Sequence, residues 1–167
     1  MTTTVVALGD ALPVLQALPR ADSAACGDDD ASSHVRTVVW GADLAALSPR
    51  RARMRLKQAA AEALDAVLDR PGISRLIVVF VRDARASAIW RVGEAIASRL
   101  CAQAVRRRGR DFDVIVVDAS DCDDAALLCD RIAESGALRA GTIGDVALEW
   151  DDIRGQSIRR AAADHSL

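Results

Sequence analysis

Three unbroken apolar runs, separated by segments of helical periodicity, constrain the fold of this chain more than any other feature. The runs are Val35–Trp40, Arg75–Val81 and Phe112–Val117. Their apolar side chains stand at consecutive positions rather than alternate ones, so both faces of each strand must be covered. The pattern therefore predicts strands in the middle of a parallel sheet, with helices packed above and below it.

Two weaker strands and four helices complete this alternation. The strands are expected at residues 4–9 and 145–150, and the helices at residues 10–18, 49–69, 86–107 and 125–136. Asp10 is expected to cap the first of these helices, and Ser48-Pro49 to begin the second. Five strands alternating with four helices predict right-handed crossovers. The expected fold class is α/β, a three-layer sandwich with a mostly parallel, about five-stranded Rossmann-like sheet.

The length of 167 residues suits one domain with a buried core. We expect a single Rossmann-like domain over residues 1–150, with a flexible polar loop at 19–34 and a polar, frayed tail at 151–167. No apolar stretch approaches the roughly 20 residues that span a bilayer, and the N-terminus does not resemble a signal peptide. The four cysteines lack metal-binding spacing. The expected location is the cytoplasm.

The charge of the chain argues against a nucleic-acid partner. Its formal net charge is −2, and the basic run Arg106–Arg108 with Arg110 is interpreted as a solvated helix end. Lys57 is the one lysine among 22 basic residues, and the chain contains no tyrosine. The missing tyrosine restricts the chemistry that the protein can perform.

Ligands of open α/β sheets bind at the carboxyl ends of the strands. Asp43, Asp83 and Asp118 follow three of these ends and could together hold a divalent metal, but acidic residues more commonly cap the following helices. Gly9 is a lone glycine where a dinucleotide site needs several, and Asp10 would repel a phosphate. No catalytic, cofactor-binding or metal-binding residue is therefore assigned, and no cofactor is expected.

Other candidate residues have simpler interpretations. His34 and His165 stand at no recognisable spacing from a nucleophile, and Ser87 is better placed as a helix cap. The large aromatic side chains are expected in the core or at its boundary. They are Trp40, Trp90 and Trp150.

In element order and apolar pattern, residues 35–150 resemble the second half of a short-chain dehydrogenase/reductase. Val38–Asp43 resembles the family's strand that ends in Asn-Asn-Ala-Gly, and Thr142–Val146 is similar to its terminal Thr-Gly turn. Leu44–Pro49 and the helix after it look like the same stretch of polyketide ketoreductase domains. The resemblance implies a Rossmann-like fold and a relative of the ketoreductases of fatty-acid and polyketide synthesis.

The chain departs from this family at the residues that carry the reaction. The family uses Tyr-x-x-x-Lys, in which the tyrosine is the general acid. Trp90–Glu94 stands in that place, and Lys57 lies in the preceding helix. The glycine-rich cofactor-binding strands are reduced to one strand and one loop. The resemblance thus implies a shortened relative that is not an enzyme.

In the same family, two long helices flank the strand that corresponds to Arg75–Val81 here. These helices pack against their counterparts in a second subunit. The resemblance implies that residues 49–69 and 86–107 form such an interface. The protein would be a structural or regulatory partner subunit of an active ketoreductase in fatty-acid or polyketide-type metabolism, or would pair with itself. The implied interface residues are Leu56, Ala60, Leu64, Trp90, Gly93, Ile96 and Leu100.

Two alternatives stay open at this point. One is a flavodoxin-like domain that binds a small molecule or nucleotide with the loops after Gly9 and Asp118. The other is an enzyme of unrecognised type that uses Asp83 or Asp118. Strand order separates the first from the leading hypothesis, because flavodoxin-like sheets run 2-1-3-4-5. A trimmed dehydrogenase would run sequentially from its first strand.

Overall fold

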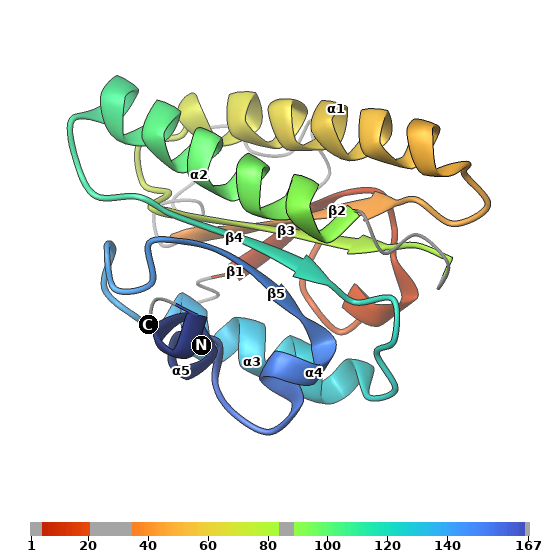
Figure 1. The fold of residues 1–167 in the computed structure, drawn as a ribbon. Helices are drawn as coiled ribbons and strands as arrows, with labels where there is room; N and C mark the ends of the chain where they lie inside the picture. The colour runs from red at the N-terminus through yellow and green to blue at the C-terminus, as the bar shows by residue number, and fades with distance from the viewer. Residues whose placement is uncertain (1–4, 21–34, 84–88, 166–167) are drawn as a thin grey trace.

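The protein forms three layers, with one parallel sheet between two layers of helices (Figure 1). The computed structural model describes residues 5–20, 35–83 and 89–165, and for Trp90 the backbone only. The strands pair in parallel in the order β1-β2-β3-β4-β5. They are β1 (Val5–Gly9), β2 (Thr37–Asp43), β3 (Arg75–Val81), β4 (Asp113–Asp118) and β5 (Asp145–Glu149). The predicted α/β sandwich is confirmed.

The strands follow one another in the sheet in the order of the chain. This sequential order excludes the flavodoxin-like order 2-1-3-4-5. The three central strands are buried on both faces, as their unbroken apolar runs predict. Their register aligns Val39 with Ile77 and Ile77 with Ile115, so each layer of side chains runs straight across the sheet.

Two long helices cover one face of the sheet. They are α1 (Pro49–Leu68) and α2 (Ile89–Arg108). Pro49 begins α1 as predicted, although the side chain of its N-cap, Ser48, makes no capping hydrogen bond. Gly109 follows α2 with a φ of 63°, the left-handed conformation that commonly ends a helix. The first part of the predicted second long helix, residues 86–88, lies outside the described residues.

The opposite face is covered by four shorter elements. They are the 3-10 turn η1 (Pro13–Leu15) and the helices α3 (Ala125–Gly136), α4 (Trp150–Arg154) and α5 (Ile158–His165). The predicted helix at residues 10–18 was too long, because only one turn forms there. Leu12 rather than Asp10 precedes that turn. Asp124 caps α3 by accepting a hydrogen bond from the Leu127 amide at 2.9 Å.

The expectation of a frayed tail after Asp151 was wrong. Ile153, Ile158 and Ala161 are at most 1% exposed and belong to the core on the α3 side of the sheet. Gly155 follows α4, so two short helices form instead of one. Because the helix axis changes there, the apolar positions follow no single helical period.

The crossover connections do not share one hand, contrary to the expectation of right-handed crossovers throughout. The chain advances along the sheet in one direction, over one face through α1 and α2 and over the opposite face through α3 (Figure 1). Parallel crossovers that advance in the same direction over opposite faces have opposite hands. The usual preference for right-handed crossovers is therefore met either by the connections through α1 and α2 or by the connection through α3, but not by both.

A buried ion pair joins β3 and β4 at the amino ends of these strands. The Arg75 Nη2 lies 2.6 Å from Asp113 Oδ2, with both side chains at most 1% exposed. The Arg75 guanidinium also donates to the carbonyl of Ser135, in the last turn of α3, and to that of Arg139, just after α3. Asp113 Oδ1 accepts from the Gly144 amide at 2.7 Å. The pair thus connects the two central strands to the segment that leads into β5.

Among the described residues, no helix has an apolar stretch long enough to cross a membrane.

Candidate functional site

The carboxyl ends of β1 and β2 are in direct backbone contact. The Asp10 amide donates to the Gly41 carbonyl at 2.9 Å. A Cβ added to Gly41 would lie 2.3 Å from the Asp10 carbonyl oxygen, and one added to Gly9 would lie 2.6 Å from the Gly41 oxygen. The loops after these strands therefore lie against each other, at the position where a Rossmann-like sheet would take a dinucleotide.

Asp10 forms an internal ion pair at this end of the sheet. Its carboxylate accepts from Arg55 of α1 at 3.0 Å and from the backbone amide of Asp43 at 2.9 Å. Trp40 also packs against Gly9, because its Nε1 would lie 2.8 Å from a Cβ at that glycine. The end of the first strand thus presents a negative charge, already paired, where a phosphate would need a donor.

The three aspartates that were considered as metal ligands do not converge. Asp43 accepts from the Ala45 amide at 2.9 Å, and Asp83 accepts from the Ala46 amide at 3.1 Å. Asp118 binds residues after β3 and β4. In the ranges that the structure covers, no group of three His, Cys, Asp or Glu side chains could hold a metal ion. Asp43 and Asp118 do not cap the following helices either, because the N-caps of α1 and α3 are Ser48 and Asp124; their carboxylates accept from loop residues at the ends of the strands instead.

A closed polar network lies at the carboxyl ends of β3 and β4. Arg82 Nε donates to Asp118 Oδ2 at 2.8 Å, and the Arg82 amide donates to Ser120 Oγ at 2.9 Å. The Ser120 hydroxyl donates to Asp118 Oδ1. Burial, with the Asp118 and Asp152 carboxylates nearby, raises the pKa of Glu149 at the end of β5. Asp118 thus joins the ends of β3 and β4 by accepting hydrogen bonds from both Arg82 and Ser120.

The residues expected at a subunit interface lie mainly between the helices and the sheet. Leu56, Ala60, Leu64, Ile96 and Leu100 belong to the core under α1 and α2, and each is at most 7% exposed. A Cβ on Gly93 would lie 3.4 Å from a Val116 methyl group, so this glycine also faces the sheet. The side chain of Trp90 lies outside the described residues. Helical period identified the buried face of each helix but not the surface that a partner could contact.

A groove runs along the outer side of the helical layer, between α1 and α2. It consists of an open hollow of about 480 Å³ and a smaller one of about 90 Å³, which share Lys57, Ile96 and Arg99. Ala60, Leu64, Ile96 and Leu100 contribute to its floor. Five basic side chains line it, with Asp65 as the acidic one: Arg53, Lys57, Arg91, Arg99 and Arg107. We call this feature the α1–α2 groove.

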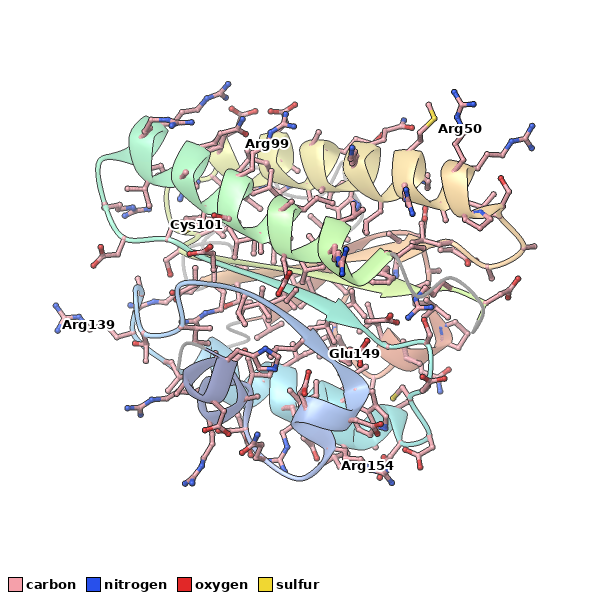
Figure 2. All side chains as sticks on the ribbon, in the orientation of Figure 1. Arg50, Arg99, Cys101, Arg139, Glu149 and Arg154 are labelled. Carbon is pink, nitrogen blue, oxygen red and sulfur yellow. The ribbon has the colours of Figure 1, made fainter. Side chains whose placement is uncertain are left out.

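The basic side chains of the groove are exposed and face solvent. Within residues 5–20, 35–83 and 89–165, none of the five forms an ion pair. Figure 2 shows the side chains of Arg50 and Arg99 on the outer side of the helical layer, whereas Arg154 lies with α4 on the opposite side of the sheet. The groove therefore carries a net positive charge, with five cations and the single carboxylate of Asp65 among its described lining residues.

Sequence reasoning missed this basic groove because no single run of residues encodes it. Arg53 and Lys57 are one helical turn apart on α1, and Arg91 and Arg99 are about two turns apart on α2. Each spacing places two cations on one side of a helix. Only the packing of α1 beside α2 brings both pairs to the same groove.

In comparisons with known proteins, no family model matches the chain, and neither a curated protein nor a solved structure shows significant similarity to it.

Proposed function

We propose that the protein is a catalytically inactive partner subunit that binds another protein through the helical layer of α1 and α2. From the resemblance of residues 35–150, the partner is an active short-chain ketoreductase of fatty-acid or polyketide-type metabolism in the cytoplasm. The proposal is supported most by the carboxyl end of the sheet. There, the Asp10 amide bonds to Gly41 and the Asp10 carboxylate pairs with Arg55, which puts a carboxylate where a cofactor's phosphates would need donors and so supports the proposal.

The absence of tyrosine supports the same proposal. Reduction of a ketone in this family needs a phenol that protonates the developing alkoxide. The full sequence contains no tyrosine, so no rearrangement of the fold could supply that group. The sequential order of the strands agrees with a dehydrogenase that lacks its second and third strands. What remains of such an enzyme is the helical layer.

Titration of the purified protein with NADPH in a calorimeter tests the loss of cofactor binding. We expect no heat above that of dilution, because the chain itself fills the cofactor position. An active short-chain reductase measured in the same buffer provides the positive control. Binding of NADPH in the micromolar range would contradict the proposal.

Co-expression tests the partner. The protein would be produced together with a full-length short-chain reductase encoded beside its gene and analysed by size-exclusion chromatography with light scattering. We expect one peak that contains both chains. A protein that stays strictly monomeric and retains no reductase would contradict the proposed function.

A further inference from the structure

The charge of the molecule is divided between its layers. Together α1 and α2 carry ten arginine and lysine residues and three acidic ones, a formal charge of +7. The whole chain carries −2, so all other residues together carry −9. A field of this kind directs the helical layer toward a negatively charged surface and raises the rate of encounter with it.

A second copy of this chain is a poor match for the groove. In a two-fold pair, the same patch of each copy meets itself, so Arg53, Lys57 and Arg99 would face an equal set of cations. Like charges brought together at an interface repel each other and act against wrong partners. The charge of the groove therefore favours a different protein over self-association.

A nucleic acid is also a poor match. Among the side chains that the structure describes, those that line the groove include no aromatic one on which a base could stack. Glu62, Asp65 and Glu94 interrupt the basic strip on α1 and α2. The charge of −9 on the other residues would repel a long polyanion. In contrast, arginines around an apolar centre are typical of protein–protein interfaces.

We propose that the α1–α2 groove is a docking surface for a partner protein that presents an acidic amphipathic helix, and that its charge prevents pairing between copies of this chain. The inference rests on the proposed function, which it deepens by naming the contact surface and the chemistry of the partner. Apolar side chains of the partner's helix contact the exposed alanines of the groove, Ala61 and Ala95. Its carboxylates pair with Arg53, Arg91 and Arg99.

Fluorescence anisotropy with a designed peptide measures the docking. The probe is a labelled 24-residue helical peptide with leucines on one face and glutamates on both flanks, and its control carries glutamine in place of glutamate. We expect the glutamate peptide to bind at least tenfold more tightly than the glutamine peptide in 50 mM salt. The advantage should disappear in 0.5 M salt, because exposed ion pairs are screened.

A pair of matched triple variants locates the binding surface. R53E/R91E/R99E reverses the charge of the groove, whereas R139E/R159E/R160E makes the same change of net charge at exposed sites outside α1 and α2. We expect the groove variant to lose at least tenfold in affinity for the peptide and the control variant to lose less than twofold. An equal loss in both variants would show that only net charge matters and would overturn the inference.

Lys57 offers an independent readout, since it is the one lysine of the chain and lines both hollows of the groove. A carbodiimide joins an amine to a carboxylate only where the two are in contact. We expect a link between Lys57 and a glutamate of the peptide, identified by mass spectrometry. K57R keeps the positive charge but should give no such link. A peptide that binds without a link to Lys57 in the wild type would contradict docking in the groove.

Other results of these experiments would show that the groove binds something other than an acidic helix, or that one of the two proposals fails. Tighter binding of a 20-base-pair DNA duplex or of phosphatidylserine vesicles than of the peptide would overturn the inference. A wild-type homodimer that R53E/R91E/R99E disrupts would also overturn it. If a co-expressed reductase binds the groove variant as well as the wild type, the proposed function stands and this inference fails. If the peptide docks in the groove but no reductase binds, the proposed function fails and the docking surface stands.

Discussion

Both ends of the central strand pair β3–β4 carry an arginine–aspartate ion pair, but the two pairs differ in their surroundings. At the amino end, Arg75 and Asp113 are at most 1% exposed. At the carboxyl end, Arg82 and Asp118 are 11% and 5% exposed. The first pair contacts backbone groups of the last turn of α3 and of the segment that leads from α3 to β5, whereas the second contacts mainly Ser120.

The same kind of ion pair therefore has a different role at each end of β3 and β4. A buried charge needs a partner and further hydrogen bonds, and the Asp113 carboxylate also accepts from the amides of Ile143 and Gly144, so the Arg75–Asp113 pair helps to determine how β5 approaches the sheet. The Arg82–Asp118 pair lies beside solvent at the edge where sheets of this class bind ligands. It neutralises charges there without organising a distant segment. The amino end is thus expected to contribute more to stability than the carboxyl end.

Replacement of Asp113 by alanine should have the largest effect. Arg75 would keep a buried charge without its partner, and the amides of Ile143 and Gly144 would lose their acceptor. We expect a loss of about 3–5 kcal/mol in the free energy of unfolding, or roughly 10 °C in Tm, measured by thermal and urea denaturation. D113A/R75M should recover at least half of that loss, since the unpaired charge is gone. A D113A protein within about 1 kcal/mol of the wild type would break the comparison.

Replacement of Gly41 by alanine tests the closed end of β1 and β2. The new Cβ would overlap the Asp10 carbonyl oxygen, and neither backbone segment can move without disturbing the sheet. We expect a loss of about 2–3 kcal/mol in unfolding free energy, measured by urea denaturation. Gly155 is the matched control, because nothing lies within 4 Å of a Cβ added there. Equal stability of G41A and G155A would show that the two loops are not tightly packed.

Replacement of Asp118 by alanine should cost less than the change at Asp113. Arg82 is partly exposed and can reach water, so only the hydrogen bonds to Arg82 and Ser120 are lost. We expect about 1–2 kcal/mol in the same denaturation measurement. A loss as large as that of D113A would remove the distinction between the two ends of the sheet.

The smallest effect is expected at Glu149. Burial and the carboxylates of Asp118 and Asp152 raise the pKa of Glu149 in the folded protein. Its ionised form is therefore less favourable when folded than when unfolded. This penalty is present above the folded-state pKa and fades as the pH falls through it. We expect E149Q to be slightly more stable than the wild type at pH 7 and equal to it near pH 4, as measured by Tm. A variant less stable at pH 7 would contradict this sign.

Strands and long helices could be predicted from the sequence because their signals are local. Unbroken apolar runs identified β2, β3 and β4, and helical period with Pro49 and Gly109 identified the limits of α1 and α2. The helices α4 and α5 could not be predicted in the same way. Their polar residues outnumber the buried ones, and a change of axis at Gly155 breaks the period.

The candidate site was less accessible to sequence reasoning than the fold. Residues such as Ile96 and Leu100 satisfied the helical period equally well as sheet-facing or partner-facing positions, and the structure buries them in the core. The exposed cations of the α1–α2 groove come from two helices that are distant in sequence. Their common surface is a property of tertiary packing, so no local pattern could reveal it.

The outer edge of β1, at one side of the sheet, is protected against pairing with an additional strand. Ala7 donates to the Pro19 carbonyl at 2.7 Å and bridges to Arg20 in parallel, and the Arg20 side chain donates to the Gly9 carbonyl. Because Pro19 lacks an amide hydrogen, this bridge cannot lengthen there into a ladder. A foreign strand thus meets an edge whose central donor is already engaged. Such an edge resists fibril-like growth at this side of the sheet and leaves recognition to side chains rather than to exposed backbone.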